Sequence, residues 1–366
     1  MRKYTHRGAT AALALATLFI TGTAPAQQLT YSAVKPGYTV SSIELGQPFG
    51  GAIAAHPTDR NIFYVSVGGW GANSVLEVTL DTGATRAITP TIGAIGGLAV
   101  LANGDLAITD NGDATYDTIL RARDLNADGD FLDDGEITQL IEPILADFSF
   151  TGAHMTVAPA GNAAGIPAGA LLVQTADGGA GSEVLVITNP ETAPAYAPPG
   201  GAYYSGFMYN GGLAFTPAGH LLVGISEFPT GKINALINSN ADDVITPDEV
   251  RTIVDDTVLA NSVSDIAVTA GNQLLTTENS GLVRMFDLPA DLATGSVGTP
   301  ETLVETNAVY LATVCLDDPA APFSPGTPGQ KATAYVGGFA PTGSATNLLA
   351  ITPRNTTAAA DWQMFE

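Results

Sequence analysis

Two acidic segments carry the strongest chemical pattern in this 366-residue sequence. In the first, short oxygen-bearing side chains alternate with other residues, and Gly129 permits a sharp turn after the third of them. Calcium is a hard cation that takes six to eight oxygen ligands, and such an alternation directs oxygens at one centre. The candidate ligands are Asp124, Asn126, Asp128, Asp130 (through its backbone carbonyl), Asp133 and Glu136. Because Glu136 comes one residue later than in an EF-hand loop, the segment predicts a calcium hairpin.

The second acidic segment follows the twelve-residue calcium spacing more closely. Its candidate ligands are Asn238, Asn240, Asp242, Val244 (through its backbone carbonyl), Thr246 and Glu249. Asn238 stands where Asp is usual and Asp243 replaces the usual Gly, so weaker binding is expected. The alternative is that both segments are solvated acidic turns. Calcium in either segment is expected to be structural.

The elements that must position any site are short strands in a recurring pattern. A pair of apolar strands around a Pro/Gly-containing turn begins near residues 51, 96, 153, 211 and 264, and a degenerate sixth copy begins near 311. The first five starts lie 45, 57, 58 and 53 residues apart, which is blade spacing. The sequence therefore predicts an all-β, six-bladed β-propeller of four-stranded blades, with the acidic calcium loops as insertions. A strand within 38–45 is expected to complete the last blade.

A second candidate site follows from aligning these repeats. Ligand sites of propellers form where the innermost strands converge on the axis. The alignment places His154 and Asp265 at equivalent positions that are small in the other repeats, and Asn210 directly before a Gly-Gly pair. These three candidate catalytic residues could hold a metal or supply a general base. The alternative is an unreactive polar plug. His56 and His220 fall in turns and are predicted to lie on the surface.

The aromatic residues suggest a ligand class. Trp70 lies among glycines, and several aromatic residues of 203–209 precede the fourth repeat. They could stack on a sugar or pack a blade interface. We therefore expect a small-molecule or carbohydrate-like ligand. No nucleophile elbow, metalloprotease His pair, phosphate loop or haem motif occurs.

The N-terminus predicts export. Residues 1–26 combine a basic start, a short apolar run and a small-residue cleavage site at Ala24-Pro25-Ala26, as in a secretory signal peptide. The run is too short for a membrane span, and no later segment reaches the required ~20 apolar residues. We expect residues 27–366 to form one secreted or periplasmic domain.

Charge and cysteine content narrow the partners. Without residues 1–26 the chain keeps ten Lys+Arg against 36 Asp+Glu, a net charge of −26. Such acidity disfavours nucleic acid and anionic membranes. The single cysteine, Cys315, excludes an internal disulfide. We expect a monomer.

The repeats resemble those of a known group of proteins. Residues 210–217, together with Asp265-Ile266-Ala267-Val268 and the following Gly271-Asn272, are similar to the repeats of six-bladed gluconolactonase/regucalcin-type, NHL-type and soluble quinoprotein glucose-dehydrogenase-type propellers. For the gluconolactonase type, the resemblance implies an axial divalent metal held by a Glu, an Asn and an Asp. Asn210 and Asp265 match the latter two, whereas Gln47 stands nearest to the Glu position, with Glu44 three residues earlier.

Three functions remain open from the sequence. The first is a metal-dependent lactonase or esterase-type hydrolase with an axial site. The second is a non-catalytic ligand- or surface-binding scaffold that calcium stabilises. The third is a quinoprotein-like sugar dehydrogenase, which would need a cationic pocket that ten Lys+Arg can hardly supply.

Overall fold

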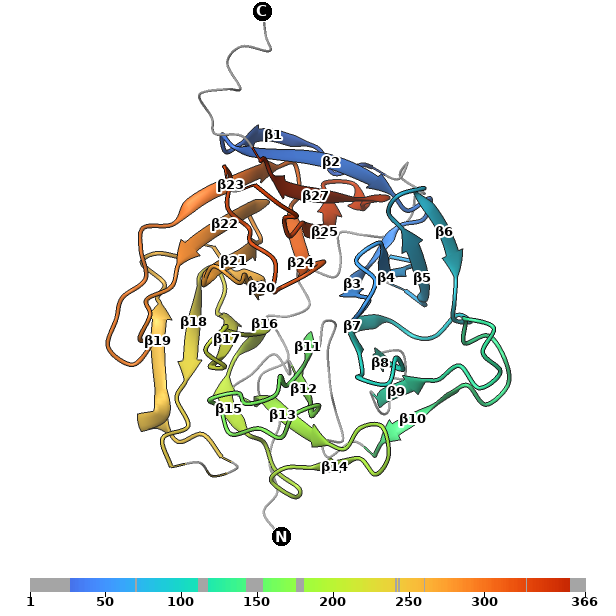
Figure 1. The fold of residues 1–366 in the computed structure, drawn as a ribbon, viewed down its shortest axis with the longest axis horizontal. Helices are drawn as coiled ribbons and strands as arrows, with labels where there is room; N and C mark the ends of the chain where they lie inside the picture. The colour runs from blue at the N-terminus through green and yellow to red at the C-terminus, as the bar shows by residue number, and fades with distance from the viewer. Residues whose placement is uncertain are drawn as a thin grey trace, which may run out of the picture.

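The computed structural model describes residues 27–69, 71–110, 118–142, 154–175, 181–240, 242, 244–259, 261–326 and 328–355. The predicted signal segment lies outside these residues. Six antiparallel sheets are arranged radially around a central axis (Figure 1). Across the described ranges, the only helix is the short 3-10 turn η1 (Pro247–Glu249), and no helix is long and apolar enough to cross a membrane.

The first three blades follow one another along the chain. Blade 1 contains β3 (Phe49–Ala55), β4 (Ile62–Val67), β5 (Ser74–Thr79) and β6 (Ala84–Ala87). Blade 2 contains β7 (Ile95–Val100), β8 (Leu106–Asp110), β9 (Thr118–Ala122) and β10 (Ile137–Ile141). Blade 3 contains β11 (His154–Val157), β12 (Leu171–Gln174) and β13 (Ser182–Thr188), with both β14 (Ala195–Tyr196) and β15 (Tyr204–Phe207) paired to β13.

The other three blades complete the ring. Blade 4 contains β16 (Tyr209–Phe215), β17 (Leu221–Ser226), β18 (Gly231–Leu236) and β19 (Val250–Val254). Blade 5 contains β20 (Val263–Val268), β21 (Gln273–Glu278), β22 (Leu282–Asp287), β23 (Glu301–Thr306) and, at its outer edge, β1 (Tyr31–Val34). Blade 6 contains β24 (Tyr310–Leu316), β25 (Ala334–Ala340), β27 (Asn347–Pro353) and β2 (Tyr38–Glu44), with β26 (Gly343–Ser344) paired to β25. The predicted six-bladed architecture is confirmed.

N-terminal strands cover the outer edges of two blades. The strand β2 pairs with β27 over its whole length, from Tyr38 opposite Pro353 to Glu44 opposite Asn347. This confirms that an N-terminal strand completes the last blade. The strand β1, which the repeats did not predict, pairs with β23 and gives blade 5 a fifth strand. These pairings satisfy the outward-facing backbone groups of β23 and β27, which would otherwise be unpaired.

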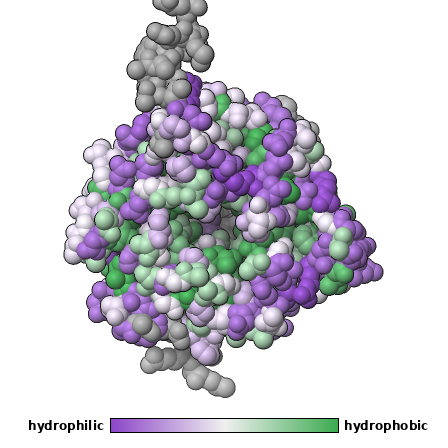
Figure 2. All heavy atoms as spheres, in the orientation of Figure 1, coloured by the Kyte–Doolittle hydropathy of each residue, from purple (hydrophilic) through white to green (hydrophobic). Residues whose placement is uncertain are grey.

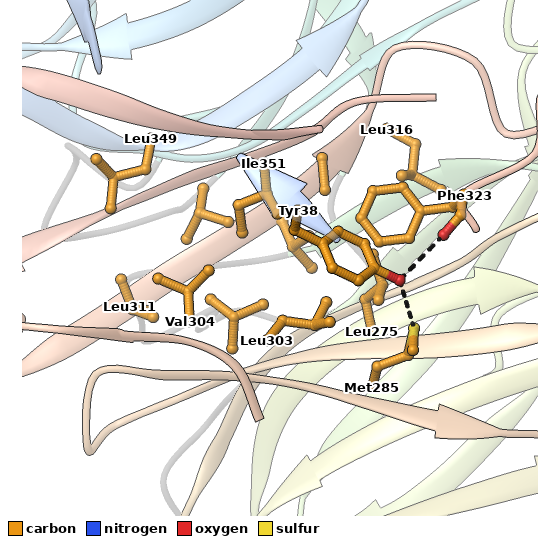
Figure 3. Packing of buried hydrophobic residues seen from close by; sticks show 14 of the residues in the cluster. Tyr38, Leu275, Met285, Leu303, Val304, Leu311, Leu316, Phe323, Leu349 and Ile351 are labelled. Atoms are coloured by element: carbon orange, nitrogen blue, oxygen red, sulfur yellow. Dashed lines mark hydrogen bonds between the residues drawn. The ribbon is translucent and has the colours of Figure 1, made fainter. Parts of the chain in front are cut away.

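The hydrophobic core is divided among the blade interfaces. Six buried clusters each combine side chains of two neighbouring blades, including the pair formed by blades 6 and 1. Figure 3 shows the cluster between blades 5 and 6, into which Tyr38 of β2 inserts. The Tyr38 hydroxyl donates to the Phe323 carbonyl at 3.4 Å, and burial raises the pKa of Tyr38 to about 12. The closing strand is therefore held by packing as well as by its ladder.

The innermost strands form a closed ring with a shared distortion. Each of β3, β7, β11, β16, β20 and β24 contacts the next, and β24 contacts β3. In all of them except β11, the pairing register shifts near the start of the strand. Such bulges re-aim side chains. In two of the distorted segments, a buried hydroxyl pairs with a backbone N–H group: Ser66 Oγ accepts from Ala52 N, and Thr109 Oγ1 accepts from Gly97 N.

Candidate functional site

A cavity of about 580 Å³ follows the axis, and all six innermost strands contribute to its wall. Figure 2 shows this face of the molecule hollowed near its middle, with both apolar and hydrophilic surface around the hollow. The wall is mostly aliphatic; its larger side chains are Ile53, Leu98, Val100, Met155, Val157, Leu213, Ile266, Val314 and Leu316. Polar side chains gather at two levels, which correspond to the starts and the ends of the innermost strands.

At the level of the strand starts, His154 and Asp265 meet on the cavity wall. His154 is the first residue of β11 in blade 3, and Asp265 lies in β20 of blade 5. The distance from His154 Nδ1 to Asp265 Oδ1 is 3.2 Å, and the two side chains are 13% and 9% exposed. The structure therefore brings together two of the three predicted catalytic residues.

Asp265 is fixed in place by blade 6. Its Oδ2 accepts hydrogen bonds from Thr313 Oγ1 and from the backbone N–H of Val314, both at 2.9 Å. Its Oδ1 accepts from the N–H of Ile266 at 2.8 Å and lies next to His154. A carboxylate with both oxygens occupied in this way has one orientation. Asp265 is therefore suited to hold the imidazole of His154.

The backbone of blade 4 packs closely against the same carboxylate. Gly212 has φ +100, and a Cβ at this position would lie 2.3 Å from Asp265 Oδ1. The fully buried Gln174 holds this glycine segment, because its Oε1 accepts from Gly212 N at 2.9 Å and its Nε2 donates to the Gly224 carbonyl at 2.7 Å. Gln174 lies opposite His154 in the sheet of blade 3. It thus links the strand that carries His154 to the glycine that faces Asp265.

Sequence reasoning missed Thr313 and Gln174. Thr313 lies within a run of apolar strand residues and Gln174 ends one, and a polar residue buried in a sheet must have a hydrogen-bond partner. That signal marks them as structurally engaged, but it does not reveal that their partners lie on a neighbouring blade.

Asn210, the third predicted residue, is not among the residues that line the cavity. Its Nδ2 atom is buried and has no hydrogen-bond partner among the described residues. Because both Asp265 oxygens are already occupied, Asn210 and Asp265 do not present a free donor set for the predicted axial metal. The axial metal remains a prediction.

A second polar group lines the cavity at the level of the strand ends. Arg60 Nη2 donates to Asp317 Oδ2 at 2.9 Å, and its Nη1 lies 3.5 Å from Asp318 Oδ2. This contact joins blade 1 to the segment that follows β24. Burial raises the pKa of Asp317, while hydrogen bonds from Thr333 and Arg60 oppose the rise. The pair therefore closes the ring at the seam between its first and last blades.

His56 also lines this level, which corrects the prediction that it lies on the surface. The side chain is half-buried and borders the cavity. Its Nδ1 accepts from the N–H groups of Thr58 and Asp59 at 3.3 and 2.9 Å. The turn after β3 thus folds back over its own histidine, which spacing alone does not reveal. His220 is half-buried and does not line the cavity.

The described aromatic residues of 203–209 do not line the cavity either. Tyr203 is buried and donates to the Ala164 carbonyl at 2.8 Å, and Phe207 stacks on Tyr204. All three belong to the cluster between blades 3 and 4, as expected for residues that pack an interface. Trp70 lies outside the described residues.

The first acidic loop connects β9 to β10. Asp124 accepts from the N–H groups of Ala127 and Gly129, and Asn126 Nδ2 donates to Asp128 Oδ2 and Asp133 Oδ2. Partial desolvation and then the nearby carboxylates, Glu136 first among them, raise the pKa of Asp133. This crowding of negative charge fits the donor chemistry of a calcium loop. Even so, no three His, Cys, Asp or Glu side chains gather within metal-binding reach in the part of the chain that the structure describes.

The second acidic loop, between β18 and β19, repeats the design of the first. Glu249 Oε1 accepts from Ser239 N and its Oε2 from Thr246 N, just as Glu136 accepts from Leu125 N and Asp133 N. Both glutamates are buried. Asn238 Oδ1 is buried without a hydrogen-bond partner among the described residues, which leaves an oxygen free for a cation. Asp243 lies outside those residues.

Both loops hold the preceding blade. Phe131 N donates to the Ile88 carbonyl of blade 1, and Ile245 N donates to the Tyr203 carbonyl of blade 3. Arg86 Nη2 also donates to the Gly129 carbonyl at 2.6 Å, and Asn238 Nδ2 to the Ala164 carbonyl at 2.9 Å. The loops therefore act as clamps between blades, whether or not a cation binds.

We expect the Glu249→Gln variant to lose acid-dependent stability. Hydrogen bonds from Thr246, and then from Ser239, lower the pKa of Glu249 from 4.5 to about 2. A carboxylate with a depressed pKa stabilises the fold above its ordinary pKa, and this stabilisation is lost as the pH falls from about 4.5 toward 2. Melting temperatures at pH 7, 5, 4 and 3 should therefore fall less steeply in the variant, which should start lower at pH 7. Asp248→Asn, at an exposed neighbour, is the control. Parallel curves for wild type and Glu249→Gln would contradict the prediction.

Comparison with known proteins shows that the fold of this chain is similar to that of solved structures. No protein-family model and no curated protein matches the chain. Among solved structures, a PQQ-bound aldose sugar dehydrogenase from Streptomyces coelicolor matches with a TM-score of 0.58 and 16% identity, over 87% of this chain and 99% of that one. The chain folds as a six-bladed β-propeller.

Other matches to this propeller carry different functions. A gluconolactonase from Xanthomonas campestris has a TM-score of 0.58 and 15% identity, over 90% of this chain and 99% of that one. The calcium-binding protein regucalcin from Agrobacterium tumefaciens has a TM-score of 0.53 and 11% identity, over 87% and 96%. At these identities the likeness establishes the fold, and the chemistry must be argued from the site.

Proposed function

We propose that this propeller is a secreted or periplasmic hydrolase of lactones or esters. In this proposal His154 is the general base and Asp265 is the residue that positions it. The observation that carries the proposal is the 3.2 Å contact between His154 Nδ1 and Asp265 Oδ1 on the wall of an axial cavity. The gluconolactonase among the similar structures supports a lactone as one substrate form.

The chemistry follows from the two side chains. A proton on Nδ1 faces the Asp265 carboxylate, which leaves Nε2 unprotonated and free to accept a proton. Nε2 takes a proton from a water molecule as the water oxygen bonds to the carbonyl carbon. The bond from that carbon to the ester oxygen then breaks, and the imidazolium returns the proton to the departing alkoxide. The products are a carboxylic acid and an alcohol, joined in one molecule when a lactone opens.

Hydrolysis by residues 27–366 tests the proposal. The purified protein is assayed with p-nitrophenyl esters and simple lactones beside the His154→Ala variant, whose expected loss is argued below. Turnover that survives in His154→Ala contradicts the proposal. Absence of turnover in both proteins favours the alternative of a ligand-binding scaffold.

A sugar dehydrogenase that uses an anionic quinone does not fit this cavity. The described residues that line it include one arginine, Arg60, and no lysine. Arg60 is already paired with Asp317 and close to Asp318. An anionic cofactor would therefore meet carboxylates in place of the cationic side chains it needs.

We also propose that the two acidic loops bind calcium and stabilise the fold. Crowded carboxylates around Asp133 and the unpartnered oxygen of Asn238 support this role. A ligand that binds only the folded state at 100 times its Kd stabilises that state by about 2.7 kcal/mol. Calcium added to EDTA-treated protein should accordingly raise Tm, and Asp124→Ala should show a smaller rise. Magnesium at the same concentration is the control. An equal rise with both metals, or in both proteins, would argue against calcium in the first loop.

A further inference from the structure

We infer that the substrate of the axial cavity is a neutral lactone or ester with an extended apolar acyl chain. The nature of the reacting bond rests on the proposed function, but the ligand class rests on the cavity wall alone. A sugar lactone or an aldose, the ligand classes of the gluconolactonase and the aldose sugar dehydrogenase with a similar fold, would not suit this wall. Shape, polarity and charge each support this distinction.

The side chains of the wall between the two polar levels offer few hydrogen-bond partners. The side chains between them are alanine, valine, leucine, isoleucine and methionine, together with Thr156 and Cys315. No Phe, Tyr or Trp lines the cavity among the described residues, so a sugar ring has no aromatic face to stack on. Sugar hydroxyls would lose their water here and gain few side-chain partners, which is unfavourable. A hydrocarbon chain gains from the same burial.

The apolar section is long enough for an extended chain. On β24, Thr313 lies at the level of Asp265, and Asp317 follows four residues later at the level of Arg60. Strand residues rise about 3.3 Å each, so the two polar levels are about 13 Å apart. A carbonyl next to His154 would therefore place an acyl chain along the aliphatic wall, with its end near Arg60.

The charges of the wall favour a neutral molecule. Among the described residues, three carboxylates line the cavity (those of Asp265, Asp317 and Asp318) against one guanidinium, that of Arg60. Free carboxylates are repelled by this balance, since like charges in a partly desolvated cavity interact unfavourably. A neutral ester can enter, and the acid that hydrolysis forms leaves more readily as its anion.

The strand β11 supplies the wall that the chain would contact first. All four of its residues are half-buried, unlike the mostly buried residues of the other innermost strands. Met155 and Val157 follow His154 on this strand and line the cavity. We therefore expect Val157 to set the accepted chain length.

Chain-length dependence tests the inference. Each buried methylene is worth about 0.8 kcal/mol, or about a fourfold gain in kcat/KM. We expect kcat/KM to rise at least tenfold from p-nitrophenyl butyrate to p-nitrophenyl octanoate, with glucono-δ-lactone hydrolysed more slowly than either. Val157→Phe should lower kcat/KM for the octanoate at least tenfold and change that for the acetate less than threefold. The matched control is Val309→Phe, because Val309 is 52% exposed and does not line the cavity.

A binding assay without turnover separates this inference from the proposed function. Nile red bound to His154→Ala is titrated with methyl octanoate and with glucono-δ-lactone. Only methyl octanoate should displace the dye. Val157→Phe combined with His154→Ala should prevent this displacement by methyl octanoate. If no ester is hydrolysed by wild type but this displacement occurs, the hydrolase proposal fails and the ligand class stands. If glucono-δ-lactone is the preferred substrate and its turnover depends on His154, the hydrolase stands and the ligand class is overturned. Absence of displacement by methyl octanoate also overturns it.

Discussion

The Asp265→Asn variant is expected to hydrolyse esters 10²- to 10⁴-fold more slowly than wild type, and His154→Ala to lose at least as much. This range is what a positioned general base typically contributes. Thr313 and Val314 donate to Asp265 Oδ2, so the Asn carbonyl oxygen would take that place and its amide group would face His154. His154 Nδ1 would then have to accept, which moves the ring proton to Nε2. The nitrogen that must take a proton from water would already carry one.

The kinetic form of the loss identifies the role of Asp265. Because the proposed acyl chain would contact the aliphatic wall, KM should change less than threefold while kcat falls. Thr313→Ser keeps a hydroxyl beside Asp265 and should retain most activity. Thr313→Val removes one of the two hydrogen-bond donors to Asp265 Oδ2, and its kcat should lie between those of wild type and Asp265→Asn. Steady-state kinetics with p-nitrophenyl octanoate on matched, folded samples provide the measurement. A raised KM with unchanged kcat in Asp265→Asn would mean that Asp265 only binds substrate.

The repeats made most of the fold predictable from the sequence. One strand pair recurs at blade spacing, and the observed innermost strands begin within a few residues of the predicted copies, including the degenerate one at β24. The strand β1 was not predicted because it belongs to no repeat. Its four residues are mostly exposed, so they carry little apolar pattern, and only its pairing with β23 reveals it.

The pair of His154 and Asp265 was predictable because aligning the repeats shows which positions carry a large polar residue where the other repeats have a small one. The structure places them 3.2 Å apart. Their supports were not predictable, because hydrogen bonds between blades depend on strand register. A bulge within Leu311–Thr313 sets the register that brings Thr313 to Asp265, and Gln174 reaches the glycines of the next blade. The spacing of residues along the chain predicts neither the contact of Thr313 with Asp265 nor that of Gln174 with the glycines.

The acidic loops show the same limit. Their spacing predicts calcium, and partial desolvation followed by nearby carboxylates raises the pKa of Asp133. The contacts of both loops with the preceding blade, through Phe131 and Ile245, were not foreseen. An apolar residue within an acidic run is the signal that could have shown them, since a loop that only binds a cation has no need to bury a side chain.

A buried ion pair in blade 5 gives the largest expected effect on stability. Glu278 is fully buried, and both of its oxygens accept from the Arg284 guanidinium, through Nε to Oε1 and through Nη2 to Oε2 at 2.7 Å. Arg284 Nη1 also donates to the Val258 carbonyl at 3.1 Å. Removal of one partner leaves the other charge buried and unpaired. We expect Arg284→Met to lower the free energy of unfolding by about 3–5 kcal/mol.

A double-mutant cycle separates the pair from its surroundings. Because hydrophobic residues of similar volume often replace a buried pair at little cost, Glu278→Leu with Arg284→Met should be more stable than Arg284→Met alone. The exposed pair of Lys35 and Glu301 is the matched control, since Lys35→Met should cost less than about 1 kcal/mol. Urea unfolding followed by circular dichroism measures wild type, Glu278→Leu, Arg284→Met, the double variant and Lys35→Met. A double variant no more stable than Arg284→Met would show that lost packing, and not an unpaired carboxylate, causes the destabilisation.

The position of this pair links its stability to the axial site. Glu278 ends β21 opposite Val263, and in the same ladder Asp265 lies opposite Thr277. The pair therefore holds the start of β20, where the bulge aims Asp265 at the axis. If that is its role, the double variant should recover its free energy of unfolding and, with it, the kcat that Asp265 supports. Recovery of stability without recovery of kcat would instead mean that the bulge in β20 needs the ion pair itself to keep Asp265 against His154.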